Sequence, residues 1–256
     1  MVSKVGLYAY GVVGESLKQL NILGIYKENK VFPVEGRNLT VLVSKIEVGK
    51  FQCQIKEGLS ELAKAKDSFP RRVEELLRTH EGVVDALGKL TTVVPFKFGT
   101  VLKDEEAALK MLQDYEEKFK KLLSKFTGKE EWGLKVYADN QEFKKHLAKV
   151  GSGGTAYLLG RKREEELKND VSARLAKASE VIFQEAGKDA YEAKLNKTLP
   201  QKLTGKEKEM ILNTAFLIER EKVTIFCKQV KKLIEKYEPM GIEIEVSGPW
   251  PPYSFT

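Results

Sequence analysis

The sequence is poor in the residues from which catalytic and metal sites are usually built. It has two histidines and two cysteines in 256 residues. Cys53 and Cys227 are far apart and show no metal-ligand spacing, which argues against a disulfide framework and indicates a reducing compartment. No glycine-rich nucleotide loop, serine-hydrolase elbow or zinc-protease motif occurs. We therefore expect no catalytic residue, no metal site, no cofactor and no enzymatic activity.

Long apolar runs are missing as well. A membrane-spanning helix needs about 18 consecutive apolar residues, and the sequence has no such run. The first residues, MVSKVGLYAYGVVGES, resemble a short signal peptide, but the tyrosines, the glycines and the lack of a cleavage site argue against one. We interpret residues 5–13 as a strand instead, and we expect a cytoplasmic protein with no membrane partner.

What the sequence does contain is charge of both signs. It has 44 basic and 37 acidic residues, which gives a net charge of +7. Its hydrophobic content of 42% is enough to form the core of one large domain or of two ordinary ones. Such a composition predicts a surface of mixed charge with a small excess of basic residues. That excess alone is weak evidence for nucleic-acid binding.

The first half of the chain predicts an α+β domain. We expect strands over 5–13, 39–48 and 91–102, and helices over 68–88 and 104–127. Ser68 can cap the first helix and Pro70 suits its first turn, while Asp104 begins the second helix. Gly128 is a natural stop for that second helix.

Pro95 lies inside the expected strand 91–102. Because proline cannot donate a ladder hydrogen bond, this strand is predicted to lie at an edge or to carry a bulge. Phe96 and Phe98 would then share one face of the strand. Pro95, Phe96 and Phe98 are therefore a candidate contact for a partner at the edge of the sheet.

The pattern changes from residue 131 onward. We expect strands over 131–139, 190–197, 208–219 and 241–247, and helices over 155–187 and 221–237. The order strand–helix–strand–strand–helix–strand is that of a ferredoxin-like split βαβ unit. The sequence thus predicts an α+β protein with two domains, 1–129 and 130–247, the second ferredoxin-like, and an extended tail rich in proline and aromatics at 248–256.

Two histidines and two unusual stretches are the remaining candidates for chemistry. His80 lies on the apolar face of the expected helix 68–88, and we interpret it as a hydrogen-bonded, partly buried residue rather than a ligand or base. His146 lies among lysines, which is typical of a solvated side chain. Glycine-rich 151–155 lacks the lysine of a phosphate-binding loop, so a flexible helix entry is preferred. The charges of 160–166 have the spacing to pair with one another.

The stretch SGPWPPYSFT, residues 247–256, combines three prolines with three aromatic residues. Consecutive prolines favour an extended conformation that loses little entropy on docking. The aromatics supply apolar area to a groove, either on this protein or on a partner. We expect mainly a clasp on its own protein, with Trp250 buried and Tyr253 and Phe255 able to reach the surface. The residues of this candidate site are Pro249, Trp250, Pro251, Pro252, Tyr253 and Phe255.

Several stretches resemble one known family. They are VVPFKFGTVL, EEWGLKVYAD, GTAYLLGRK, LNTAFLIE and SGPWPPYSF, with LYAYGVV, VLVSKIEV and THEGVV in support. In order, and over nearly the whole chain, they are similar to the GvpL/GvpF family of gas vesicle proteins. GPWPPYSF is the most specific of these matches.

The resemblance implies a non-enzymatic accessory or minor structural protein of gas vesicles, which are hollow protein shells of certain bacteria and archaea. It implies a role in nucleation or early assembly and contact with the small hydrophobic shell protein and other accessory proteins. It also implies two α+β domains, the second related to ferredoxin-like folds. A partner that covers the gas-facing apolar surface of a shell subunit would limit its aggregation before assembly.

Two other classes of function stay open at this point. A basic nucleic-acid-binding module is suggested by the net charge of +7 and the ferredoxin-like half, and it would need surface aromatics on the sheet with a basic rim. A small-molecule enzyme is suggested only by size, and the scarcity of histidine and cysteine argues against it. We expect the assembly role in the gas vesicle, with no nucleic-acid partner.

Overall fold

The computed structural model describes residues 4–14, 17, 20–64, 71–150 and 162–256. Contacts between Cα atoms divide the chain into two compact units. The first unit consists of Met1–Glu130 together with Trp250–Thr256, and the second consists of Glu131–Pro249. The chain therefore passes between the units twice.

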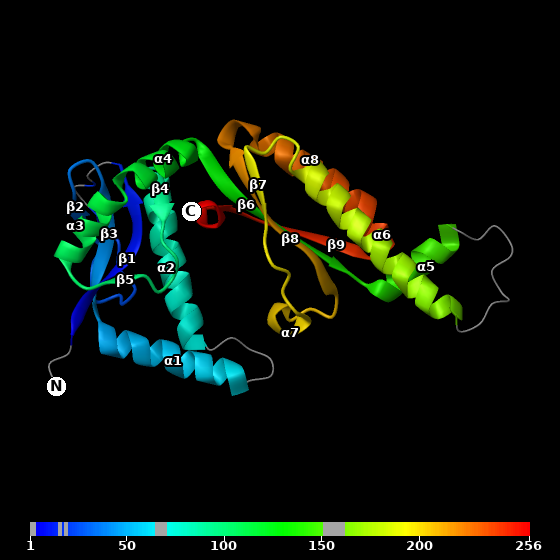
Figure 1. Ribbon diagram of the computed structural model, residues 1–256, viewed down its shortest axis with the longest axis horizontal. Coiled ribbons are helices and arrows are strands. Elements are labelled where there is room, and N and C mark those ends of the chain that lie inside the picture. The colour runs from blue at the N-terminus through cyan, green and yellow to red at the C-terminus, as the bar shows by residue number, and fades with distance from the viewer. Residues whose placement is uncertain (1–3, 15–16, 18–19, 65–70, 151–161) are drawn as a thin grey trace. The chain divides into compact units, whose positions relative to one another are not determined.

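The first unit is built on an antiparallel sheet (Figure 1). Its strands are β1 (Val5–Val13), β2 (Phe32–Glu35), β3 (Thr40–Glu47), β4 (Val93–Pro95) and β5 (Val101–Leu102). The order is β2-β3-β1-β4, and β5 also pairs with β1. Eight of the nine residues of β1 are buried, as its continuous apolar run predicts for a central strand. The predictions of strands over 5–13 and 39–48 are confirmed.

A bulge interrupts β1 where its pairing register with β3 shifts between Ala9 and Gly11. A Cβ atom on Gly11 would lie 2.7 Å from the Val94 carbonyl oxygen of β4 and 2.7 Å from the Val93 Cγ2 atom. Real Cβ atoms do not come this close to a backbone oxygen. The bulge and the close approach of β4 therefore require glycine at position 11.

The prediction of one strand over 91–102 is wrong. The segment forms two short strands, β4 and β5, and Phe96 and Phe98 lie in the connection between them. Pro95 is the last residue of β4, and Gly99 turns the chain with a φ of +87°, a conformation that suits glycine. Phe96 and Phe98 consequently do not share a strand face.

Four helices pack on this first sheet, and a longer helix was predicted where two occur. They are α1 (Val48–Lys64), α2 (Arg71–Leu90), α3 (Glu105–Asp114) and α4 (Glu116–Phe126). The single helix predicted over 104–127 breaks at Tyr115, which has φ −115° and ψ 18° and is exposed. Asp104 caps α3 by accepting a hydrogen bond from the Ala107 N–H. Ser68 and Pro70, the expected start of α2, lie outside the described residues.

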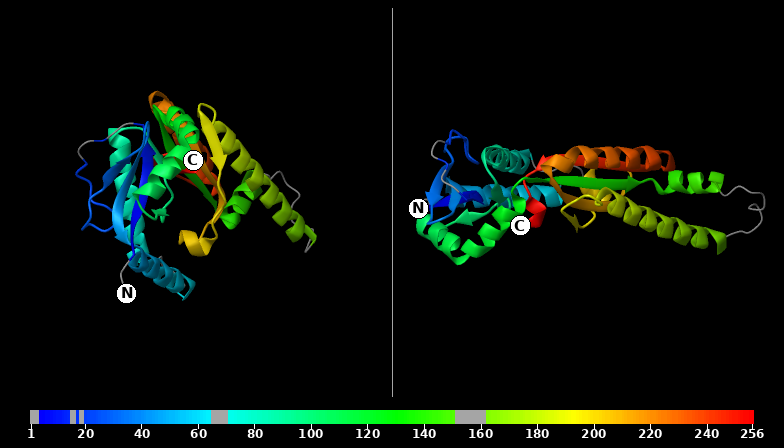
Figure 2. Two further views of the ribbon diagram at one scale, coloured as in Figure 1. Left: turned by 60° about the vertical axis from the view of Figure 1, so that its left-hand side comes forward. Right: turned by 90° about the horizontal axis from the view of Figure 1, so that it is seen from above.

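The second unit is built on another antiparallel sheet, with helices on one face (Figures 1 and 2). Its strands are β6 (Lys129–Ala138), β7 (Glu192–Leu195), β8 (Glu209–Glu219) and β9 (Ile242–Trp250), in the order β7-β8-β6-β9. Its helices are α5 (Asn140–Val150), α6 (Lys162–Ala186), α7 (Gln201–Thr204) and α8 (Val223–Tyr237), with short 3₁₀ turns at Arg220–Lys222 and Glu238–Met240. Helices α5, α6 and α8 contribute buried side chains to one core with β6, β8 and β9.

The second unit departs from the sequence-based expectation at α5, at α7 and at the end of β9. Helix α5 was not predicted, because its sequence is strongly charged and follows the strand directly. Strand β9 continues to Trp250, three residues beyond the expected end at 247. A 3₁₀ turn then follows at Tyr253–Phe255. The glycine-rich stretch 151–155 lies outside the described residues. The chain is an α+β protein with two antiparallel sheets.

Candidate functional site

The described residues do not form a metal-binding cluster. In the part of the chain that the structure describes, no group of three histidine, cysteine, aspartate or glutamate side chains is placed to hold a metal ion. Nor does any helix among the described residues combine the length and apolar character needed to cross a membrane. The candidate sites are therefore surfaces and buried contacts.

His80 lies at the centre of a buried polar chain in the first unit. Its Nε2 atom lies 3.1 Å from the Phe96 carbonyl oxygen, which can only accept, so Nε2 carries the proton. Its Nδ1 atom then accepts a hydrogen bond of 3.0 Å from the Tyr8 hydroxyl group. The Tyr8 oxygen in turn accepts from the Gly99 N–H at 3.0 Å. This chain ties α2 to β1 and to the β4–β5 connection, and it confirms the interpretation of His80 as a hydrogen-bonded core residue.

Burial controls the ionisation of these groups. It lowers the pKa of His80 to about 4, partly opposed by the hydrogen bond to Phe96. It also raises the pKa of Tyr8 far above its ordinary value, and it raises the pKa of Tyr10 to about 12. All three groups are therefore neutral at pH 7.

The tail segment, defined as Trp250–Thr256, packs with the first unit. The Tyr253 ring lies 6.1 Å from the His80 ring, centroid to centroid, and is packed against the core cluster that contains Tyr8 and Tyr10. The Phe255 ring lies 5.5 Å from Lys125 Nζ of α4, which is a cation–π distance. The tail thus contacts two elements of this unit, α2 and α4.

The three aromatic residues of the tail differ in burial. Phe255 is 5% exposed and Tyr253 is half-buried, whereas Trp250 is 37% exposed at the end of β9. Pro252 is buried, and Pro249 and Pro251 are more exposed. The anchor is therefore Phe255 with Tyr253, rather than Trp250 as the sequence suggested.

The three residues of the candidate edge contact, Pro95, Phe96 and Phe98, lie in different surroundings in the structure. Strand β4 is at the end of the sheet order, but Pro95 itself is buried. The Phe96 ring packs edge-on to Phe119 of α4, at 6.1 Å. The Phe98 ring instead packs near His80, at 5.9 Å. Both phenylalanines therefore support the first unit from within, and they do not form one surface patch.

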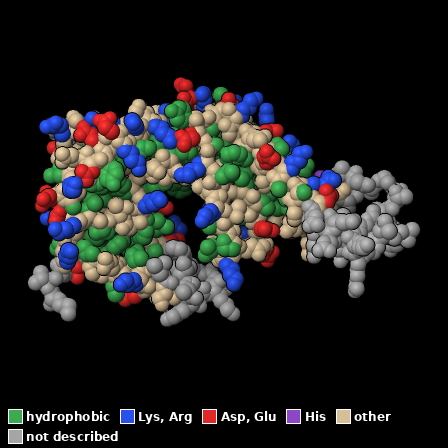
Figure 3. All heavy atoms as spheres, in the orientation of Figure 1, with side chains coloured by type: hydrophobic (Ala, Val, Ile, Leu, Met, Phe, Trp, Pro, Cys, Tyr) green, Lys and Arg blue, Asp and Glu red, His purple; other side chains and the backbone are tan. Residues whose placement is uncertain are grey.

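Three exposed leucines lie in the segment that runs from the last residue of the edge strand β7 into helix α7 of the second unit. Leu195 is 60% exposed, Leu203 of α7 is 58% exposed, and Leu199 between them is 37% exposed. We call these three residues the leucine row. On the face of the molecule shown in Figure 3, apolar side chains reach the surface between basic and acidic ones. The leucine row could not be predicted from the sequence, because residues 195–203 have no clear periodicity.

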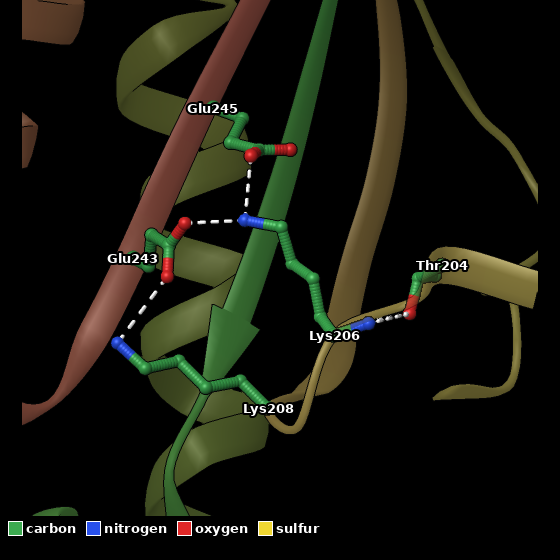
Figure 4. A network of polar contacts seen from close by, with 5 residues as sticks. All are labelled: Thr204, Lys206, Lys208, Glu243 and Glu245. Carbon is green, nitrogen blue, oxygen red and sulfur yellow. Dashed lines mark hydrogen bonds and ion pairs between the residues drawn. The ribbon is translucent and has the colours of Figure 1, made fainter. Parts of the chain in front are cut away.

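A charged network fixes the segment next to the leucine row (Figure 4). Lys206 binds Glu243 and also Glu245, the latter at 2.5 Å, and its Nζ atom lies 4.4 Å from the centre of the Tyr137 ring. Lys208 adds an ion pair of 3.3 Å with Glu243. Tyr137, Glu243 and Glu245 alternate with core-facing residues of β6 and β9, so Lys206 crosses the sheet face opposite the helices.

The hydrogen bond to Glu243, followed by the one to Glu245, raises the pKa of Lys206 above its ordinary value. The hydrogen bond from Lys206 likewise lowers the pKa of Glu243. Both groups are charged at neutral pH. Sequence reasoning did not find this network, because its partners are far apart in the chain.

Replacing Lys206 by methionine should loosen the α7 segment. The substitution keeps a long apolar stem over Tyr137 but leaves Glu243 and Glu245 side by side without their shared cation. Because the group is partly exposed, we expect a loss of only about 1 kcal/mol in the free energy of unfolding. Hydrogen exchange measured by mass spectrometry should become faster in residues 200–208.

Lys202→Met is the matched control, since Lys202 is an exposed lysine of α7 itself. Its exchange profile should match that of the unchanged chain. Equal protection of residues 200–208 in the Lys206→Met variant would contradict the assignment of Lys206 as the residue that holds this segment.

These features describe a class of protein, an α+β protein built on two antiparallel sheets. Comparison with known proteins agrees with this class. A sequence profile of the family described as gas vesicle synthesis protein GvpL/GvpF matches residues 6–256. The chain therefore belongs to the GvpL/GvpF family of gas vesicle proteins. This is a structural, non-enzymatic family, so the expected absence of enzymatic activity follows from the family assignment.

The chain is similar to gas vesicle proteins L and F of several organisms. The chain is 27% identical to gas vesicle protein L of Streptomyces sp. (strain CB03234), over 70% of this chain and 67% of that protein. It is 23% identical to gas vesicle protein F1 of Halobacterium salinarum, over 97% of this chain and 92% of that protein.

Crystal structures show the same fold. The gas vesicle protein GvpF from Anabaena sp. PCC7120 superposes with a TM-score of 0.73 at 22% identity, and covers 98% of this chain and 95% of its own. GvpF from Microcystis aeruginosa gives a TM-score of 0.69 at 19% identity, with 98% of each chain covered. The chain thus has a GvpF-like fold. Its membership of the GvpL/GvpF family shows that it takes part in gas vesicle formation.

Proposed function

We propose that this protein acts in nucleation or assembly of gas vesicles as an accessory or minor structural component. In this role it binds the hydrophobic shell protein, and other accessory proteins, and limits aggregation of shell subunits before they assemble. It acts in the cytoplasm and at the vesicle. The family match over residues 6–256 is the observation that carries this proposal.

The leucine row supports an apolar contact with shell protein. Leu195 and Leu203 expose apolar area beside an edge strand, where another chain can lie along the sheet. The Lys206 network ties the segment that follows α7 to strand β9, which limits how far Leu203 can move. A row of this kind suits a partner whose own surface is apolar.

We also propose a domain assignment. The boundary is placed at 129/130, with a ferredoxin-like second domain over 130–247 and the tail acting as a clasp on the first domain. The strand order β7-β8-β6-β9 supports the ferredoxin-like assignment. When the strands of this unit are numbered along the chain, the order is 2-3-1-4, which is the strand order of a ferredoxin-like sheet. The burial of Phe255 and the contact of Tyr253 with His80 support the clasp.

A nucleic-acid-binding role has less support. The sheet aromatic Tyr137 is buried and covered by Lys206, and it lies beside Glu243 and Glu245. Carboxylates at this place repel phosphate, and a buried ring offers no face for a base to stack on. The face of this sheet that lies opposite the helices is therefore unlike that of an RNA reader.

The proposed contact predicts salt-resistant binding. Capture of shell protein by the tagged chain should persist when salt is raised to several times physiological ionic strength, because apolar contacts are not screened while surface ion pairs are screened within about 8 Å. Leu195→Ser/Leu203→Ser should lower this capture at least about tenfold, since even one leucine that becomes fully buried in the contact contributes roughly 1.5–3 kcal/mol.

Leu90→Ser is the matched control, because Leu90 is 60% exposed, like Leu195, but lies on α2 of the first unit. Its capture of shell protein should be unchanged. Binding that disappears at high salt, or that the Leu195→Ser/Leu203→Ser variant retains in full, would overturn the apolar contact.

A further inference from the structure

The tail segment completes one unit but follows the other in sequence. Trp250–Thr256 is grouped with Met1–Glu130, although the whole of Glu131–Pro249 lies between them along the chain. The covalent link between the tail and its site therefore runs through the complete second unit. The contacts in the site do not depend on that link.

The tail site of the first unit is held together by contacts within that unit. His80 is fixed by hydrogen bonds to Tyr8 and to the Phe96 carbonyl group. Lys125 lies on α4, where its Nζ atom is 5.9 Å from the centre of the Phe126 ring. The hydrogen bonds of His80 do not involve the tail, so this part of the site does not need the tail for its geometry, whereas Lys125 Nζ contacts both Phe126 and Phe255.

The tail has a local shape of its own. The Tyr253 N–H donates to the Pro251 carbonyl oxygen at 2.7 Å, and the Phe255 N–H donates to the Pro252 carbonyl oxygen at 3.2 Å. The Thr256 hydroxyl group donates to the Tyr253 carbonyl oxygen at 3.1 Å. Together with the fixed φ angles of the prolines, these bonds reduce the entropy that a docking peptide loses.

We propose that the tail site of one copy also receives the Trp250–Thr256 segment of a second copy, so that copies join by exchanging tails. Exchange reproduces the contacts made within one chain and needs no new interface. The protein's own tail competes better for the site than the tail of a second copy, because it is covalently tethered. The tether gives the tail an effective concentration at the site of about millimolar order. Exchange therefore grows with the local concentration of the protein.

The first test asks whether the site accepts a tail that is not tethered. The probe is a fluorescent peptide of residues 247–256, and the receptor is the full chain carrying Tyr253→Ala and Phe255→Ala. We expect the peptide to bind this variant and to bind the unchanged chain at least about tenfold more weakly, because the tethered tail competes for the site. A peptide with the same two alanines should bind neither. If the double variant does not melt cooperatively, Phe255→Ala alone serves as the receptor.

The second test asks whether the donor is another copy. The tagged double variant is mixed with untagged, unchanged chain at concentrations up to about the hundred-micromolar range, where exchange begins to compete with the tether. Captured unchanged chain should rise with concentration and fall when the free peptide is added. No peptide binding to the variant would overturn the tail site as a receptor. Peptide binding without capture of the unchanged chain would overturn the second copy as its occupant.

Discussion

Replacing His80 by leucine should lower the free energy of unfolding by about 3 kcal/mol, since each buried polar group left without a partner costs roughly 1–3 kcal/mol. The substitution keeps apolar volume in the core but leaves the Phe96 carbonyl group without a donor and the Tyr8 hydroxyl group without an acceptor. Urea unfolding followed by tryptophan fluorescence or circular dichroism gives the value.

The same variant should change how stability depends on pH. The pKa of His80 is lowered to about 4 by burial, whereas the ordinary value applies in the unfolded chain. Between these two values the unfolded chain binds more protons than the folded one, so stability falls as pH falls from about 6.5 to about 4. The loss is on the order of 3 kcal/mol for one group shifted this far. His80→Leu should lack this step.

The difference between the two pH curves isolates His80 from the carboxylates that titrate near the acid end of the range. His146→Leu is the control for the substitution itself, because it replaces the other histidine of the chain, which lies on α5 in the second unit. Parallel curves for the unchanged chain and His80→Leu between about pH 6.5 and 4 would contradict a buried neutral His80.

Substituting Gly11 by alanine should lower the free energy of unfolding by about 2–3 kcal/mol, the usual cost of overpacking a tight core position. The added Cβ would come within 2.7 Å of both the Val94 carbonyl oxygen and Val93 Cγ2. Strand β4 would have to move away from β1, which weakens the pairing of the two strands. Thermal or urea unfolding measures the loss.

Gly82→Ala provides the control for this change, because a Cβ on Gly82 of α2 would meet no atom within 4 Å. Alanine in the middle of a helix should raise stability by up to about 1 kcal/mol relative to glycine. The two substitutions add the same methyl group and should act in opposite directions. A Gly11→Ala variant as stable as the unchanged chain would show that the bulge does not require glycine.

The sequence predicts those elements whose pattern is local. The continuous apolar runs of β1 and β8, and the amphipathic stripes of α2 and α8, identify these elements because periodicity reflects burial directly. The break at Tyr115 escaped prediction because the apolar spacing of α3 continues into α4 without interruption. Short elements such as β2 and α7 carry too few residues for any period to be visible.

The candidate sites were predicted less completely than the fold. The aromatic composition of the tail indicates that it docks, but not which ring is buried, since Phe255 meets Lys125 only through the tertiary structure. Lys206 looks like any other surface lysine in the sequence, and its partners Glu243 and Glu245 lie on a distant strand. Charge pairs between distant segments leave no local pattern from which they can be inferred.

The grouping of Trp250–Thr256 with the first unit has a consequence for biosynthesis. A ribosome makes Met1–Glu130 first, yet the Phe255 side chain that packs beside Lys125 is made only after the whole second unit. The nascent first unit therefore exposes the tail site throughout translation of residues 131–249. During this interval the tail of a finished neighbouring chain, for instance one made on the same messenger RNA, has access to a site whose own occupant does not yet exist.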